Sequence, residues 1–229
     1  MRQFLTALAV TGILSTNPAA AESPVVVELF TSQGCSSCPP ADAFLHDLAK
    51  RDDVIALALH VDYWDYIGWK DIFAKPEYTA RQHAYAQAAN ATTVYTPQMV
   101  INGKDHVVGS RPMQVMDIVQ AHRANGSPVD VSLTRNGDTV QINARGNAPG
   151  DYVVQLVRYT PQQAVAIRRG ENAGRDLNYA HIVNAWDVIA DWNGAAPLRM
   201  SASVTGGDPV VVIIQETRNG PIVGAAELR

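Results

Sequence analysis

The chain has 229 residues, of which 47% are hydrophobic, and 22 acidic against 18 basic side chains give it a formal net charge of −4. An acidic balance without a block of Lys and Arg argues against nucleic acid as a partner. The length suits one large domain or two domains of about 100 residues each.

The first residues follow the order of a secretory signal peptide. Residues 1–3 (MRQ) give a basic start, residues 4–15 are apolar but too short to span a membrane, and residues 19–21 (AAA) form a small-residue cleavage site. We therefore expect residues 1–21 to be removed after Ala21. The mature protein is then expected to be periplasmic or secreted, without a membrane span.

The next segments predict a parallel β-α-β unit. Residues 25–30 (VVVELF) are short, apolar and β-branched, which is typical of a buried strand. Apolar side chains at helical spacing between Ala41 and Ala49 predict a helix, and the apolar run 54–61 predicts a second buried strand. Two wholly apolar strands joined by a helix indicate parallel pairing.

Two helices and a β-hairpin between them complete the first half of the chain. Residues 76–91 predict a helix, and residues 99–101 and 106–108 flank Asn102-Gly103, a pair that supplies the positive φ angles of a tight hairpin turn. Another helix is expected from Ser110 to Gly126.

The pattern of apolar and polar residues changes after the candidate linker 125–128 (NGSP). Short segments in which apolar and polar residues alternate, separated by Gly and Asn turns, predict a mainly β, sandwich-like domain over residues 127–229. One stretch, residues 179–192, is expected to interrupt it as a helix.

The chain has two cysteines, Cys35 and Cys38. A bond between them would close a very short loop and remove little entropy from the unfolded chain, so structural stapling explains the pair poorly. Redox chemistry or metal binding explains it better. Cys35 is expected to open the helix, where first-turn N–H groups favour a thiolate, and Cys38 to resolve a mixed disulfide one turn later.

Two stretches carry a family resemblance. Residues 27–39, with the Cys-Ser-Ser-Cys motif, and residues 95–103 (YTPQMVING) together resemble the thioredoxin superfamily, and residues 95–103 are similar to the glutaredoxin segment with its cis-proline. The resemblance covers residues 25–125. It implies an α/β fold in which a thioredoxin-like domain over residues 22–126 precedes the β domain.

The resemblance also implies roles for individual residues. Thr96–Pro97 is expected to be a cis bond beside the cysteines, with the backbone of Thr96 pairing with a substrate strand. Glu28 matches the buried carboxylate that takes a proton from Cys38. The alternative for Glu28 is a strand residue that faces the other domain.

The whole chain, including residues 168–175 (RRGENAGR), is also similar to a bacterial family of secreted thioredoxin-like proteins of unassigned function. The segment 168–175 could hold an anionic ligand or partner. It could equally be a solvated loop, or one whose arginines bond backbone carbonyls.

Two other features keep alternatives open. Cys35, Cys38 and His60 could together bind copper, because soft thiolates and imidazole suit this metal. The five aromatic residues between Tyr63 and Phe73 could form an apolar wall for an extended polypeptide, or could pack within the protein.

The sequence therefore predicts a secreted or periplasmic thiol–disulfide oxidoreductase that needs no cofactor beyond its redox-active disulfide. Its partners would be protein or peptide thiols and disulfides together with an unidentified redox partner. The competing prediction is a non-catalytic thioredoxin-like module that binds peptide or copper.

Overall fold

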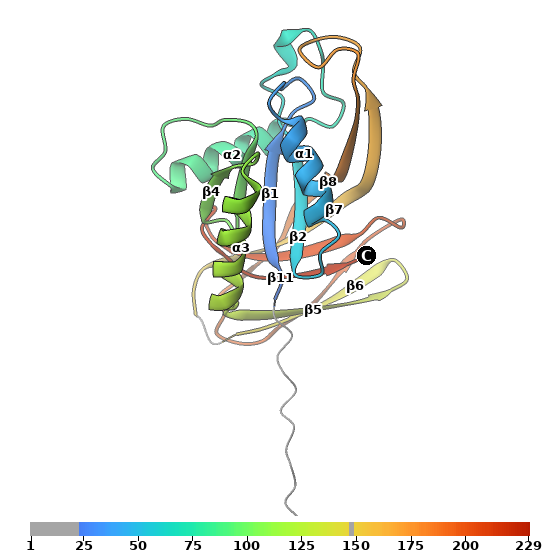
Figure 1. The fold of residues 1–229 in the computed structure, drawn as a ribbon. Coiled ribbons are helices and arrows are strands. Elements are labelled where there is room, and N and C mark those ends of the chain that lie inside the picture. Colours follow the sequence, from blue (N-terminus) through green and yellow to red (C-terminus); the bar gives the residue numbers. More distant parts are fainter. Residues whose placement is uncertain (1–22, 147–148) are drawn as a thin grey trace, which may run out of the picture.

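The structure is a computed structural model that describes residues 23–146 and 149–229, so the predicted signal peptide lies outside the described residues. Figure 1 shows helices packed on a large twisted sheet with a smaller sheet beneath it. The helices are α1 Pro39–Leu48, the short 3₁₀ helix η1 Asp65–Ile67, α2 Pro76–Ala88 and α3 Pro112–Asn125. The strands are β1 Val25–Thr31, β2 Val54–His60, β3 Gln98–Ile101, β4 Asp105–Val108, β5 Val129–Asn136, β6 Thr139–Gly146, β7 Tyr152–Ala166, β8 Asp176–Trp192, β9 Leu198–Ser203, β10 Val210–Glu216 and β11 Ile222–Leu228.

The first half of the chain has the elements expected from its sequence. Strands β1 and β2 pair in parallel from Val25↔Val54 to Thr31↔His60, with α1 between them in the chain. Strands β3 and β4 form the expected hairpin, and Asn102 and Gly103 at its turn have positive φ angles of 45° and 66°. The α/β class is confirmed in this coarse form.

Eight strands form one mixed sheet in the order β11-β10-β7-β8-β2-β1-β3-β4, and three form a second sheet in the order β5-β6-β9. Strand β8 pairs in parallel with β2 through Ala58↔Ile182 and antiparallel with β7. Four strands from residues 127–229 therefore extend the sheet begun by residues 22–126. The two parts of the chain share this sheet. The division into two domains after residue 126 stays a prediction.

The prediction of a helix over residues 179–192 is wrong. These residues belong to β8, whose residues 179–183 are all buried between β2 and β7. The pairing with β7 shifts register twice, between Val154 and Gln155 and between Arg158 and Tyr159. Such bulges interrupt the two-residue period of a strand, so the apolar pattern resembles that of a helix.

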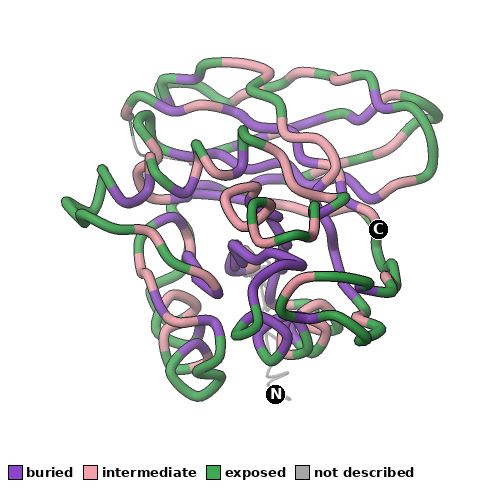
Figure 2. The backbone as a smooth tube through the Cα atoms, turned by 90° about the horizontal axis from the view of Figure 1, so that it is seen from above, coloured by how far each residue is buried: buried purple, intermediate pink, exposed green. Residues whose placement is uncertain are grey.

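Three apolar cores hold these layers together, and Figure 2 shows the buried backbone gathered towards the middle of the molecule. One core joins α1 and α3 to one face of the sheet, and a second joins α2 to the other face. The third fills the space between the small sheet and strands β7 and β10, which thus pack face to face. Among residues 23–146 and 149–229, no helix is long and apolar enough to cross a membrane.

This arrangement fixes where polar chemistry can occur. Because β1 and β2 are parallel and in register, their carboxyl ends meet at Thr31 and His60. Loops at the carboxyl ends of parallel strands are the usual place for a site in an α/β sheet. The turn that carries both cysteines leaves β1 at this edge.

Candidate functional site

The Cys-Ser-Ser-Cys turn lies between β1 and α1. Cys35 and Cys38 form a disulfide with a Cα–Cα distance of 5.4 Å. The backbone N–H of Cys35 donates to the Ser32 carbonyl (3.1 Å) and that of Cys38 to the Cys35 carbonyl (3.2 Å). Both cysteines are buried, whereas the intervening Ser36 and Ser37 are exposed. The chain thus presents the turn, rather than the sulfur atoms, to solvent.

The expectation that Cys35 opens helix α1 is wrong. Its first residue is Pro39 and Cys38 occupies the N-cap position, so Cys35 lies in the turn before the helix. The two prolines at the helix start have no N–H to donate, which costs little where such groups lack intrahelical partners. Cys38, the closer of the two cysteines, therefore sits at the positive end of the helix dipole.

The structure brings Thr96 and Pro97 to this turn. The Thr96–Pro97 bond is cis, as the resemblance implied. The Ser37 hydroxyl donates to the Thr96 carbonyl at 3.5 Å, and the Trp64 indole N–H donates to the Thr96 hydroxyl at 2.8 Å. The Thr96–Pro97 peptide bond therefore lies next to the turn of residues 35–38 that carries the two cysteines.

Glu28 lies in a buried hydrogen-bonded cluster with two residues of α2. Its carboxylate accepts hydrogen bonds from Arg81 (2.6 and 3.1 Å) and from the Tyr85 hydroxyl (2.5 Å), and it is fully buried. Alternation along β1 turns Glu28 to the sheet face covered by α2, whereas α1 covers the other face. Arg81 also donates to Gln155 and Gln215 from the second half of the chain. The contacts match the alternative for Glu28, a strand residue facing that half.

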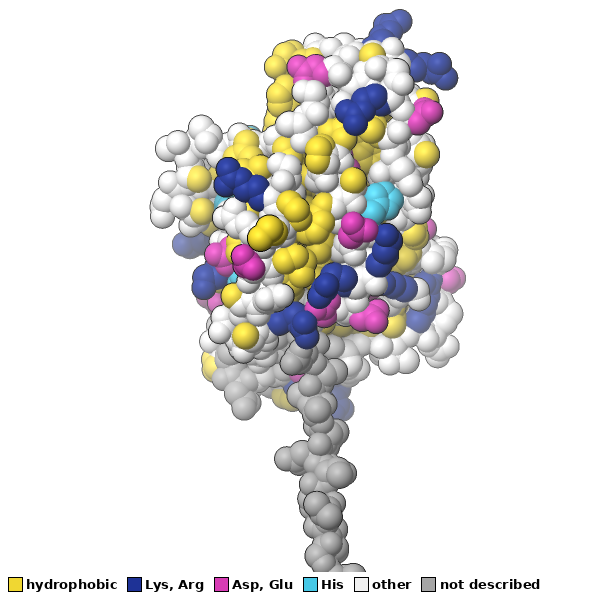
Figure 3. Space-filling model, in the orientation of Figure 1, with side chains coloured by type: hydrophobic (Ala, Val, Ile, Leu, Met, Phe, Trp, Pro, Cys, Tyr) yellow, Lys and Arg dark blue, Asp and Glu magenta, His cyan; other side chains and the backbone are white. Residues whose placement is uncertain are grey.

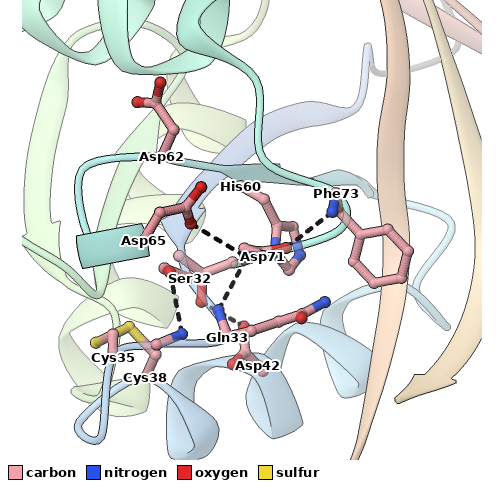
Figure 4. Close-up of polar contacts among 12 residues, drawn as sticks. Ser32, Gln33, Cys35, Cys38, Asp42, His60, Asp62, Asp65, Asp71 and Phe73 are labelled. Carbon is pink, nitrogen blue, oxygen red and sulfur yellow. Dashed lines mark hydrogen bonds and ion pairs between the residues drawn. A yellow bond between two sulfur atoms is a disulfide. The ribbon is translucent and has the colours of Figure 1, made fainter. Parts of the chain in front are cut away.

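His60 is a buried residue with a carboxylate partner. Its Nδ1 donates to Asp71 (2.7 Å), which also accepts from the Gln33 and Phe73 amides (2.8 and 2.9 Å), as Figure 4 shows. Burial alone would raise the pKa of Asp71, but the charge of His60 and these hydrogen bonds hold it below its usual range. Phe73 and Tyr179 pack edge-on against the His60 ring, with centroids 5.1 and 5.0 Å away.

Asp42 is a site residue that sequence reasoning missed. It lies one helical turn after Cys38, and its backbone N–H donates to the Cys38 carbonyl at 3.1 Å. Residues four apart share one face of a helix, so this carboxyl group lies on the side of α1 that carries Cys38. Burial raises the pKa of Asp42 to about 7, against the opposing effects of His60 and of a 2.8 Å hydrogen bond from Thr31. The signal available in the sequence was an acidic residue at the edge of an apolar helix stripe.

Several buried polar atoms around Asp42 lack hydrogen-bond partners within the described part of the chain. They are Asp42 Oδ2, His60 Nε2, Gln33 Nε2 and the Tyr179 hydroxyl. A neutral carboxyl group is consistent with this environment, because an unpaired buried charge is far more costly than an unpaired hydroxyl.

Of the five aromatic residues between Tyr63 and Phe73, four are partly buried within the protein and one is exposed to solvent. Tyr63 and Trp64 pack against the core beneath α2, and Trp69 donates its indole N–H to Gln33 at 2.8 Å. Tyr66, in contrast, stacks on Trp64 with 81% of its surface exposed. Figure 3 shows further hydrophobic side chains over and between α1 and α3, below the cysteine turn.

The alternative copper ligand set, Cys35, Cys38 and His60, stays a prediction. The sulfur atoms of Cys35 and Cys38 are bonded to each other, and His60 is bonded to Asp71. Among the residues that the structure describes, no three His, Cys, Asp or Glu side chains form a group able to hold a metal ion.

Comparisons with known proteins give a family and two similar structures. The family model described as "Protein of unknown function (DUF1223)" matches residues 26–215. Protein AGR_C_4864 from Agrobacterium tumefaciens, which has a crystal structure, shares 35% sequence identity with this chain. The two structures align with a TM-score of 0.80 over 91% of this chain and 96% of that one. HBP35 of Porphyromonas gingivalis is 16% identical, with a TM-score of 0.65, over 90% of this chain and 75% of that one, a likeness of fold alone. No curated protein matches the sequence.

Proposed function

This chain belongs to the family of proteins of unknown function (DUF1223), and we propose that it is a periplasmic or secreted thiol–disulfide oxidoreductase with a thioredoxin-like core. One observation carries the proposal. The Cys35–Cys38 disulfide lies at the carboxyl end of β1, beside the cis Thr96–Pro97 bond.

The arrangement of the first half supports the thioredoxin-like part of the proposal. Strands β2, β1, β3 and β4 are neighbours in that order, β2 is parallel to β1, and β3 and β4 are antiparallel to their neighbours. Helices α1 and α3 cover one face and α2 covers the other. This arrangement supports a thioredoxin-like core, with Cys38 at the N-cap of α1 and Cys35 in the turn before it.

The proposed reaction moves two electrons between the cysteine pair and a substrate disulfide. The Cys35 thiolate attacks one substrate sulfur, forming a Cys35–substrate disulfide and releasing the other substrate sulfur as a thiolate that takes up a proton. The Cys38 thiolate then attacks Cys35, which forms the Cys35–Cys38 bond and releases the second substrate thiolate. The same steps in reverse oxidise a substrate dithiol.

The ionised form of Asp42, which is in equilibrium with the neutral form near pH 7, is the proposed proton acceptor for Cys38 in the second step. It shares a helix face with Cys38, and a carboxyl group whose pKa lies near 7 exchanges protons effectively at neutral pH. Glu28 is not given this role, because Arg81 and Tyr85 occupy its carboxylate.

The substrate is a protein or peptide, docked with its backbone along Thr96 and with Tyr66 available as an exposed apolar contact. The partner that renews the cysteine pair is a second dithiol or disulfide protein. We place both in the periplasm or outside the cell, following the signal peptide predicted over residues 1–21.

Trapping of mixed disulfides tests the proposal. A Cys38→Ser variant, expressed with residues 1–21 in place, is expected to accumulate adducts through Cys35 that a reducing gel removes. The matched control is Cys35→Ser, which leaves the resolving cysteine alone and should trap few adducts or none.

The competing function gives the opposite result. If Cys38→Ser traps no adduct and the reduced wild-type protein retains one copper ion per chain after dialysis, the protein is a binding module. Loss of that copper in Cys35→Ser would then assign the metal to the cysteine pair.

A further inference from the structure

The loop between β7 and β8, residues 167–175, lies against the cysteine turn. Figure 1 shows this connection beside the segment that precedes α1. Asn172 in this loop is buried, with 1% of its surface exposed, although most residues of the loop are exposed. Its Nδ2 donates to two backbone carbonyls of the turn, those of Gln33 and Cys35, both at 3.0 Å.

Other hydrogen bonds hold the Asn172 side chain in place. The Arg175 guanidinium donates to Asn172 Oδ1 at 3.0 Å. Within the loop, the Gly174 N–H donates to the Ile167 carbonyl (2.8 Å) and the Ile167 N–H to the Arg175 carbonyl (2.9 Å). Asn172 thus reaches the turn from a closed loop, with a cation behind its amide oxygen.

A second side chain of the loop meets the turn with the opposite charge. Glu171 Oε2 accepts a hydrogen bond from the backbone N–H of Ser36 at 3.3 Å. Ser36 directly follows Cys35, so the carboxylate takes up an N–H group next to the proposed nucleophile. The loop therefore brings a polarised donor to the Gln33 and Cys35 carbonyls and an anion to the Ser36 N–H.

We infer that Asn172 is a positioning residue for Cys35, so that the redox site includes the β7–β8 loop of the second half of the chain. The inference rests on the proposed exchange chemistry and adds a residue 137 positions away in sequence. Asn172 fixes the backbone of the residue that carries the attacking sulfur. It also directs the positive end of its amide dipole, backed by Arg175, towards that backbone, which favours the Cys35 thiolate. Glu171 disfavours the same thiolate by its charge.

Loss of the Asn172 contact and loss of the Glu171 contact should shift the pKa of the Cys35 thiol in opposite directions. Asn172→Ala and Arg175→Gln should raise the pKa of Cys35 by about half a unit, which lowers the thiolate fraction about threefold at neutral pH. Glu171→Gln should shift this pKa downwards. Arg169→Gln, an exposed charge removed from the same loop, is the matched control and should leave it unchanged.

The titration uses the full mature chain with Cys38→Ser, following the rate of Cys35 alkylation against pH. Arg175 and Glu171 are exposed, so their variants should fold even if Asn172→Ala does not. The inference is overturned if Asn172→Ala and Arg175→Gln change only the melting temperature and leave the Cys35 pKa as in the parent. It is equally overturned if Arg169→Gln shifts the pKa as much as Arg175→Gln, since the effect would then be one of general charge.

Failure of the proposed function has a separate signature. In that case the wild-type protein forms no mixed disulfides with other proteins, whatever the alkylation pKa. If the wild-type protein exchanges normally and the loop variants leave the Cys35 pKa unchanged, the oxidoreductase stands and the role of Asn172 falls.

Discussion

Asp42 holds a buried carboxyl group whose protonation differs between the folded and unfolded chain. In the folded protein burial raises its pKa to about 7 from the usual 3.8, so the folded state keeps a proton that the unfolded state releases. The stability that this proton supplies is complete below about pH 4 and is lost as the pH rises towards 7. Asp71 behaves in the opposite sense, because its lowered pKa favours the folded state above pH 4.

Asp42→Asn should therefore remove one component of the pH dependence. Asn keeps an oxygen for the Thr31 hydroxyl and cannot ionise, so the variant should gain stability over the wild type on the order of 3 kcal/mol at pH 8 but little at pH 4. Urea unfolding of the wild type and the variant at both pH values measures this. Asp47→Asn, an exposed position on the same helix, serves as the control. An equal gain at both pH values would contradict the assignment.

Glu28 and Arg81 form a buried ion pair on the sheet face covered by α2. Glu28→Gln leaves the Arg81 cation buried without its anion, which should cost about 3 kcal/mol in the free energy of unfolding. The rate of disulfide exchange per folded molecule should not change. The double variant Glu28→Gln, Arg81→Gln should recover part of the loss. Slower exchange with unchanged stability would instead restore the catalytic role that the sequence suggested for Glu28.

At the scale of elements, the β3–β4 turn requires both a positive φ angle and close packing against another loop at the same residue, Gly103. Gly103 has a φ of +66°, and a Cβ there would lie 2.7 Å from the Gly220 carbonyl oxygen in the loop between β10 and β11. Gly137, at φ +60°, has open space around it. Gly137→Ala should cost about 1 kcal/mol from backbone strain alone, and Gly103→Ala clearly more. Thermal unfolding of the two variants separates these contributions, and equal losses would show that the turn is not tightly packed.

The elements that sequence reasoning found are those with a regular period or a strong turn signal. The β1–α1–β2 unit and the Asn102-Gly103 hairpin follow from local patterns, and so do the position of the cysteines and the segment that carries Pro97. Strand β8 was missed because bulges disturb its period and because its burial depends on β2 and β7. Asp42 and Asn172 were missed for a related reason. Their surroundings come from β2 and from the β7–β8 loop, which no short stretch of sequence reveals.

At the scale of the whole molecule, the shared sheet predicts that residues 22–126 do not fold alone. Removing the rest of the chain takes β8 from the edge of β2 and removes Val157, Tyr159 and Val183 from the core beneath α2. A strand edge exposed next to an open core favours aggregation or a loosely packed state. The isolated fragment should show weak near-ultraviolet circular dichroism and rapid amide exchange, whereas residues 22–126 within the full chain should be protected. A fragment with native-like protection would instead support two independent domains.

The contact between Asn172 and the cysteine turn also sets an order of events in the making of the protein. A chain is synthesised from its N-terminus, so Cys35 and Cys38 exist long before Asn172, which follows Cys35 by 137 residues. During that interval the two thiols have no β7–β8 loop to cover them and are open to any oxidant that the chain meets. The cysteine pair therefore experiences two chemical environments in its lifetime, and its final reactivity is acquired only when the last third of the chain has docked.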